Sequence, residues 1–149
     1  INVVRWATVY AGDPIQGGFT NYATAQNGYQ LYAYTQGLIS IRKATNAFRL
    51  PDSATTNLAS LPVSGAGSTV LAFGYRAAST DGTGTYYVFH NADSAAHSWT
   101  VDASLAGAQL LADGGSAGLS PITASASVTL SADGKTVTLA PLTSAIFRQ

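Results

Sequence analysis

The segment HNADSAAH, residues 90–97, holds both histidines of the chain together with one aspartate. His90, Asp93 and His97 are residue types that bind transition metals, and a metal site would need them to converge on one point. A spacing of seven between the two histidines fits neither one face of a helix nor a short ligand loop. We therefore expect His90 to end a strand and His97 to lie in a loop, and we predict no metal site and no cofactor.

Nucleophilic chemistry is not indicated either. Many serines accompany the two histidines, but a Ser-His-Asp triad is recognised by geometry, which the presence of these residue types does not supply. The glycine-rich stretches GDPIQGG, residues 12–18, and DGTGT, residues 81–85, lack the Lys-Ser/Thr pair and the following helix of a phosphate-binding loop. We expect both to be turns, and we assign no catalytic residue to the chain.

Aromatic side chains are better candidates for ligand contact, because sugar rings stack on exposed Trp and Tyr. The residues to consider are Trp6, Tyr10, Tyr86, Tyr87 and Trp99. Strand alternation would send the two adjacent tyrosines to opposite faces of a sheet. Core packing is the main alternative for each aromatic residue. Trp6 is the preferred substrate-binding candidate, because it comes shortly before the helix predicted below.

The overall composition narrows the classes of function. The net charge is zero and only 9% of residues are charged, so the chain lacks the basic field of nucleic-acid-binding proteins. Its longest apolar runs are far shorter than the ~20 residues that span a bilayer. There is no cysteine, which excludes disulfides and thiolate zinc sites. A surface rich in Ser, Thr, Asn, Gln and Gly suggests a secreted or cell-surface bacterial protein, and the missing methionine suggests a mature fragment.

An amphipathic helix is predicted over residues 29–44. Apolar side chains recur there at three- and four-residue spacing, and two basic residues lie in the last turn, where cations favour the carbonyl end of the helix dipole. Pro51 prevents continuation. One helix with a single apolar stripe needs a partner surface, so Leu31, Leu38 and Ile41 are expected to form a packing stripe.

Downstream of Pro51 the pattern becomes that of short strands separated by turns. Alternation on both sides of Asp133-Gly134 predicts a tight hairpin, and the aromatic-rich runs 69–75 and 85–91 are expected to be covered on both faces. Many short strands without intervening helices predict a mainly β fold, an antiparallel β-sandwich. The expected strands, about eight, are 58–63, 69–75, 85–91, 98–102, 109–112, 127–130, 135–139 and 145–148.

Several stretches resemble, in order, the C-terminal end of type I pullulanase-like debranching enzymes of the α-amylase superfamily. GLISIRKATNAFRL, residues 37–50, is similar to the family pattern G-L-I-x-x-R-K-x-x-x-A-F-R, and INVVRW, residues 1–6, to the N-x-I-x-W stretch before it. VLAFGY, YYVFHNAD and LTSAIFR are similar to three strands of the family's C-terminal domain. The chain departs from the family at Thr45-Asn46, where the family usually has His-Pro.

The resemblance implies a division into two parts. Residues 1–50 would be the end of a (β/α)8 catalytic barrel, a loop plus its last helix, and residues 51–149 a C-terminal all-β sandwich. The family hydrolyses α-1,6 bonds of pullulan and branched starch, and its catalytic acid is a Glu, a residue type that this chain does not contain. The chain would therefore be a non-catalytic portion that stabilises the upstream barrel, its expected partner, and would meet α-glucan only through the parent enzyme. Calcium in the parent is left open.

Two alternatives come from other classes. A free-standing carbohydrate-binding module would need at least two aromatic side chains on one exposed face. A structural surface-layer or adhesin sandwich should lack the barrel-type helix, so the predicted helix weighs against it.

Overall fold

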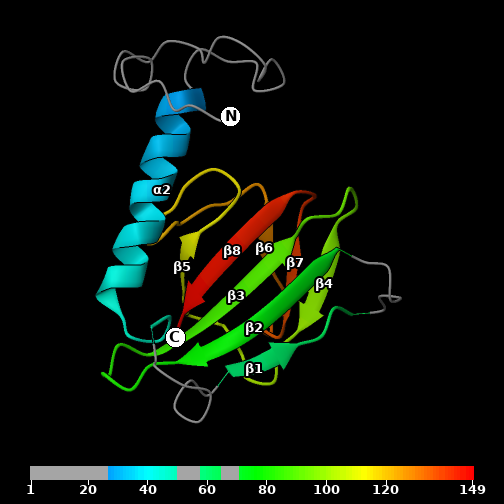
Figure 1. Cartoon of the computed structure of the whole chain (residues 1–149). Helices are drawn as coiled ribbons and strands as arrows, with labels where there is room; N and C mark the ends of the chain where they lie inside the picture. Colours follow the sequence, from blue (N-terminus) through cyan, green and yellow to red (C-terminus); the bar gives the residue numbers. More distant parts are fainter. Residues whose placement is uncertain (1–26, 50–57, 65–70) are drawn as a thin grey trace.

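A computed structural model describes residues 27–49, 58–64 and 71–149 (Figure 1). These residues form one helix and eight strands. The elements are α2 (Asn27–Ala44), β1 (Leu58–Leu61), β2 (Ala72–Ala78), β3 (Thr85–Asn91), β4 (His97–Thr100), β5 (Gln109–Ala112), β6 (Val128–Leu130), β7 (Thr136–Leu139) and β8 (Thr143–Arg148).

The strands form two antiparallel sheets. The larger has the order β1-β2-β3-β8-β5, and the smaller has the order β4-β7-β6. The core between them includes Trp99 and Phe89, whose ring centroids lie 5.4 Å apart, and both side chains are fully buried. The predicted mainly β sandwich is therefore confirmed.

Some strand boundaries could be predicted from the local sequence pattern and others could not. Strands β3 and β5 have the predicted bounds, whereas β2 runs to Ala78, three residues beyond the prediction. The reason is tertiary, because β2 pairs with β3 along its whole length, from Ala72↔Asn91 to Ala78↔Thr85. The run 85–91 is covered on both faces, as predicted, but β2 is not, because Phe73 is exposed.

The hairpin at Asp133-Gly134 is present, with β6 pairing β7, but its turn is longer than predicted. The backbone amide of Ser131 donates to the carbonyl of Thr136, and only Gly134 has a positive φ, of 70°. Its carbonyl also accepts from the Leu105 amide. A contact with a distant loop thus helps to set the shape of the turn.

Helix α2 lies against the outer face of the five-stranded sheet, on the side of β5 and β8 (Figure 1). Ile41 is 2% exposed and belongs to a second apolar cluster with Tyr86 and Leu111. Tyr34 donates a hydrogen bond of 3.0 Å from its hydroxyl to the carbonyl of Asp113. The helix is therefore held by one apolar and one polar contact on the same side.

The C-terminal end of α2 is tied to the β2–β3 hairpin. Asn46 donates from its backbone amide to the Asp81 carboxylate at 2.8 Å and exchanges two further hydrogen bonds with Thr80. The Thr83 hydroxyl lies 2.6 Å from that of Thr45, which is 1% exposed. The two residues that depart from the family pattern therefore have polar partners within this chain.

Gly37 of α2 lies tightly against the rest of the chain. A Cβ placed there would lie 1.9 Å from the carbonyl oxygen of Ala117. Gly37→Ala is expected to destabilise the chain by about 1–3 kcal/mol through overpacking, despite the gain of about 1 kcal/mol in helix propensity. Urea unfolding measures the difference. Ser40→Ala, on the exposed side of α2, serves as the control, and greater stability of Gly37→Ala would show that the contact is absent.

Candidate functional site

The outer face of the five-stranded sheet is only partly covered by α2. Strand alternation and register place Phe73 and Tyr75 of β2, His90 of β3 and Ser144 of β8 on this face. Phe73, the second residue of β2, is 58% exposed. An aromatic side chain left open in this way marks the sheet face as a candidate interaction surface.

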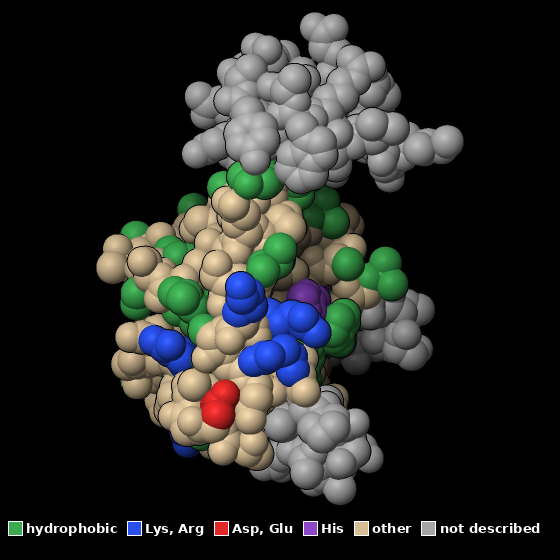
Figure 2. All heavy atoms as spheres, turned by 60° about the vertical axis from the view of Figure 1, so that its left-hand side comes forward, with side chains coloured by type: hydrophobic (Ala, Val, Ile, Leu, Met, Phe, Trp, Pro, Cys, Tyr) green, Lys and Arg blue, Asp and Glu red, His purple; other side chains and the backbone are tan. Residues whose placement is uncertain are grey.

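A groove runs between the helix and this part of the sheet. It has a volume of about 240 Å³, and its lining includes the cation Arg42 as well as His90. Figure 2 shows Lys and Arg side chains gathered next to a histidine and hydrophobic groups on this side of the molecule. The lining residues are Leu38, Ile41, Arg42, Phe48, Tyr75, Val88, His90 and Ile146.

A second hollow, of about 370 Å³, adjoins the groove at His90 and includes Phe73 and Leu142 in its lining. Leu142 is 79% exposed and has a φ of 53°. A leucine in the left-handed region is uncommon and costs free energy, and such strain clusters at functional positions. We call Leu38, Arg42, Phe73, Tyr75, His90 and Leu142 the open face.

His90 lies at the centre of the open face. Its Nδ1 is 2.8 Å from the Ser144 hydroxyl, and its ring centroid is 4.7 Å from that of Phe73 and 6.5 Å from that of Tyr75. Burial lowers the pKa of His90 below its ordinary value of 6.5, because the half-buried ring loses hydration when charged. At neutral pH this side chain is therefore an uncharged member of an aromatic group.

The neutral state of His90 predicts a pH dependence of stability. As the pH falls below 6.5, the unfolded chain takes up the proton before the folded chain does, so stability decreases towards the lower folded pKa. Thermal unfolding between pH 7.5 and 5 should show a steeper loss for the wild type than for His90→Gln, which does not titrate. Described aspartates with lowered pKa values titrate below this window. Equal slopes would contradict burial of the neutral ring.

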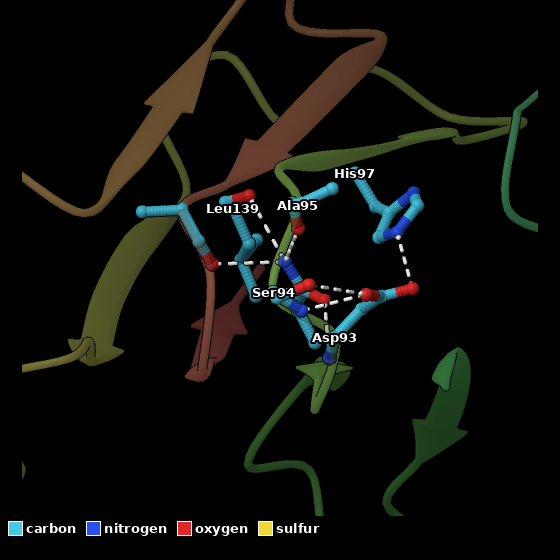
Figure 3. Close-up of polar contacts among 7 residues, drawn as sticks. Asp93, Ser94, Ala95, His97 and Leu139 are labelled. Carbon is cyan, nitrogen blue, oxygen red and sulfur yellow. Dashed lines mark hydrogen bonds and ion pairs between the residues drawn. The ribbon is translucent and has the colours of Figure 1, made fainter. Parts of the chain in front are cut away.

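The other histidine takes part in a separate network at the β3–β4 turn (Figure 3). Its Nε2 lies 3.2 Å from the Asp93 carboxylate, and this hydrogen bond, with that of the Ser94 amide, lowers the pKa of Asp93. Asn91, 2% exposed, donates from Nδ2 to the carbonyls of Ala95 at 2.8 Å and Ala140 at 2.9 Å, with Leu139 at 3.3 Å. Asn91 thus links the β3–β4 turn to the segment at the end of β7.

Comparison with known proteins identifies the family and supports the fold. The sequence pattern of the SpuA C-terminal family matches residues 57–149. The chain belongs to this family. No curated protein matches the chain.

Solved structures of two streptococcal enzymes have the same fold. The catalytic module of SpuA, described as a multi-modular glycogen-degrading pneumococcal virulence factor, is 26% identical, with a TM-score of 0.73 over 89% of this chain and 20% of that one. The pullulanase SAP of Group B Streptococcus is 23% identical, with a TM-score of 0.69 over 90% of this chain and 18% of that one. The same pullulanase bound to maltotetraose is 26% identical, with a TM-score of 0.71 over 88% and 17%.

The chain therefore corresponds to the C-terminal part of a pullulanase-like enzyme, and the resemblance seen in the sequence is confirmed. It spans 14–20% of the length of the solved chains that it matches. The family match begins at residue 57 and thus covers the sandwich, while α2 lies before it.

The structure does not bring the histidine pair together. His90 faces Ser144 on the five-stranded sheet, and His97 faces Asp93 from β4 of the other sheet. Across residues 27–49, 58–64 and 71–149, no three His or Asp side chains form a group that could hold a metal ion. Within the same residues, no helix is long and apolar enough to cross a bilayer.

The aromatic candidates separate into two groups. Tyr86, Tyr87 and Trp99 are at most 2% exposed, and the two tyrosines lie in different apolar clusters, so none of the three is available for stacking. Trp6 and Tyr10 lie outside the described residues, so Trp6 stays a prediction. Phe73 is exposed instead, and the sequence analysis did not single it out.

Only part of the predicted packing stripe is buried in the described structure. Ile41 is buried on the sandwich, whereas Leu31 is 60% and Leu38 36% exposed. At 3.6 residues per turn, Leu38 lies about 60° and Leu31 about 80° around the helix from Ile41. The sandwich therefore covers one edge of the apolar arc and leaves the other edge beside the groove.

Sequence reasoning missed Phe73 and Leu142. The sequence contained a signal for Phe73. In the run 69–75, apolar residues occur at both odd and even positions, so both faces of the strand carry apolar side chains that need a packing partner. For Leu142 the sequence offered no signal, since its exposure and positive φ arise from the turn that enters β8.

Proposed function

We propose that this chain is the non-catalytic C-terminal portion of a glycoside hydrolase that acts on α-1,6 bonds of pullulan and branched starch. Residues 1–50 would complete the catalytic barrel, and residues 51–149 would form the sandwich that stabilises it. The family match and the relatives named above support this division. α-Glucan would meet the chain only through the parent enzyme, which we expect to be secreted or held at a bacterial cell surface.

The open face is the observation on which the stabilising role depends. Phe73 and Leu142 are more than half exposed, and the groove beside them reaches the uncovered edge of α2 at Leu38. Burying a side chain of this size stabilises a protein by about 1.5–3 kcal/mol. Packing the open face against the barrel would therefore hold the two parts together without disulfide bonds.

The test uses the enzyme that carries this chain and, in parallel, the 149-residue chain. Phe73→Asp should lower the unfolding temperature of the enzyme and shorten its half-life in pullulan hydrolysis, because an unpaired charge would be buried at the contact. In the chain by itself the same change should have little effect, since Phe73 is 58% exposed there.

Thr129→Asp provides a matched control. It adds the same charge at an exposed position of β6, in the other sheet. Equal shifts of the unfolding temperature for Phe73→Asp in the enzyme and in the chain would argue against docking through the open face.

A free-standing carbohydrate-binding module is the second candidate, because Phe73 and the partly exposed Tyr75 share the open face. Isothermal titration of the chain with branched maltooligosaccharides distinguishes the two functions. Binding heat with the wild-type chain that disappears in Phe73→Ala would favour sugar binding. No binding heat with the wild-type chain would favour docking.

A further inference from the structure

Arg42 has an unusual environment for an exposed cation. It lines the groove together with apolar side chains such as Leu38 and Val88 and with the neutral His90, and no carboxylate lines that groove. In the last turn of α2, its charge also favours the carbonyl end of the helix dipole. The helix dipole stabilises this positive charge but supplies no counter-ion.

The described aspartates are engaged elsewhere. Asp102 pairs with Arg76 at 2.8 Å, and Asp93 pairs with His97. Asp81, Asp113 and Asp133 accept hydrogen bonds from turn residues around them. Among the residues that the structure describes, Arg42 therefore has no carboxylate within ion-pair distance.

Docking would change the environment of this cation. A partner that covers the open face removes water from the groove, and a buried charge without a counter-ion costs several kcal/mol. A carboxylate can meet a guanidinium with two parallel hydrogen bonds, which offsets that cost and fixes the register. The hollow at Phe73 and Leu142 requires apolar side chains from the same partner.

We propose that the open face receives an apolar segment of the upstream enzyme that carries an Asp or Glu, whose carboxylate pairs with Arg42. This inference rests on the proposed function and adds the chemistry of the partner. The aromatic and leucine side chains supply the contact area, and the ion pair sets the register in which the segment lies along the groove.

Zero-length cross-linking tests the pairing. In the whole enzyme, Arg42→Lys combined with Lys43→Arg leaves an amine at position 42 and removes the one beside it. Carbodiimide should then join Lys at position 42 to an Asp or Glu upstream of this chain, identified by peptide mass spectrometry. The wild type, whose amine at Lys43 lies about 100° further around the helix, is the control. A link to Asp13, Asp52 or another aspartate of the chain, or no link, would overturn the proposal.

Thermal unfolding separates this inference from the proposed function. Arg42→Met keeps the apolar stem and should lower the unfolding temperature of the enzyme by about 2 °C or more. Lys43→Met removes a cation from the same last turn of α2 without removing the ion pair, and should lower that temperature less. If Phe73→Asp destabilises the enzyme but Arg42→Met does not, docking stands and the ion pair is wrong. If neither variant has an effect, the proposed function itself fails.

Discussion

Replacement of Ile41 by aspartate is expected to detach α2 from the sandwich. The side chain is 2% exposed and packs in a cluster with Tyr86, Leu111 and Ala112. Burying a carboxylate in this apolar cluster would cost several kcal/mol. In hydrogen exchange, amides of 27–44 should lose protection, whereas those of β3 and β8 should keep theirs, because the core around Trp99 is separate.

Ile39→Asp is the matched control for this change. It places the same charge on the same helix, two residues away, where the side chain is 53% exposed. Protection of α2 should stay near the wild-type level in that variant of the chain. Equal loss of protection in both variants would mean that burial of Ile41 does not hold the helix.

Asn91→Asp is expected to have a comparable effect through hydrogen bonding alone. The amide nitrogen donates to the carbonyls of Ala95, Leu139 and Ala140, and the change replaces it with an acceptor at nearly constant volume. Buried carbonyls without a donor cost about 1–3 kcal/mol, and more where a charge is involved. We expect a loss of about 3 kcal/mol or more in urea unfolding at pH 7.

The pH dependence of this variant identifies the mechanism. Burial against carbonyl oxygens should raise the folded-state pKa of the new carboxyl above its unfolded value, so part of the stability returns as the pH falls and the group becomes protonated. Gln36→Glu makes the same chemical change at an exposed position and should show neither effect. A loss at pH 7 with no recovery at pH 5 would indicate altered packing instead.

The C-terminal end of α2 is held by hydrogen bonds of Thr45 and Asn46, the two residues at which the chain departs from the resemblance seen in its sequence. Asn46 and Thr45 bind the β2–β3 hairpin through side-chain and backbone groups. The hydrogen bonds to Asp81, first that of the Thr83 hydroxyl, lower the pKa of this carboxyl, so it is ionised and able to accept them at neutral pH. The end of the helix is thus fixed by polar contacts, whereas its middle is fixed by Ile41 and Gly37.

The amino-acid sequence by itself determined the helix, the strand-rich second part and the family. The helix follows from apolar residues at three- and four-residue spacing, and strands such as β3 follow from β-branched and aromatic runs between turns. These signals are local, because backbone hydrogen bonding and the direction of successive side chains depend on near neighbours. The family could be recognised from the sequence because several of its motifs occur in the same order along the chain.

Only the tertiary structure decided which apolar side chains are covered. Ile41 and Leu38 are indistinguishable in an amphipathic pattern, yet one lies in a core and the other beside a groove. Phe73 is open because β2 extends beyond the area that α2 covers, and Leu142 is exposed by the conformation of a turn. Whether an apolar side chain is buried depends on how segments far apart in the sequence pack together. The periodicity of a helix or strand shows which side of it is apolar, but only the tertiary packing determines which part of that side is covered.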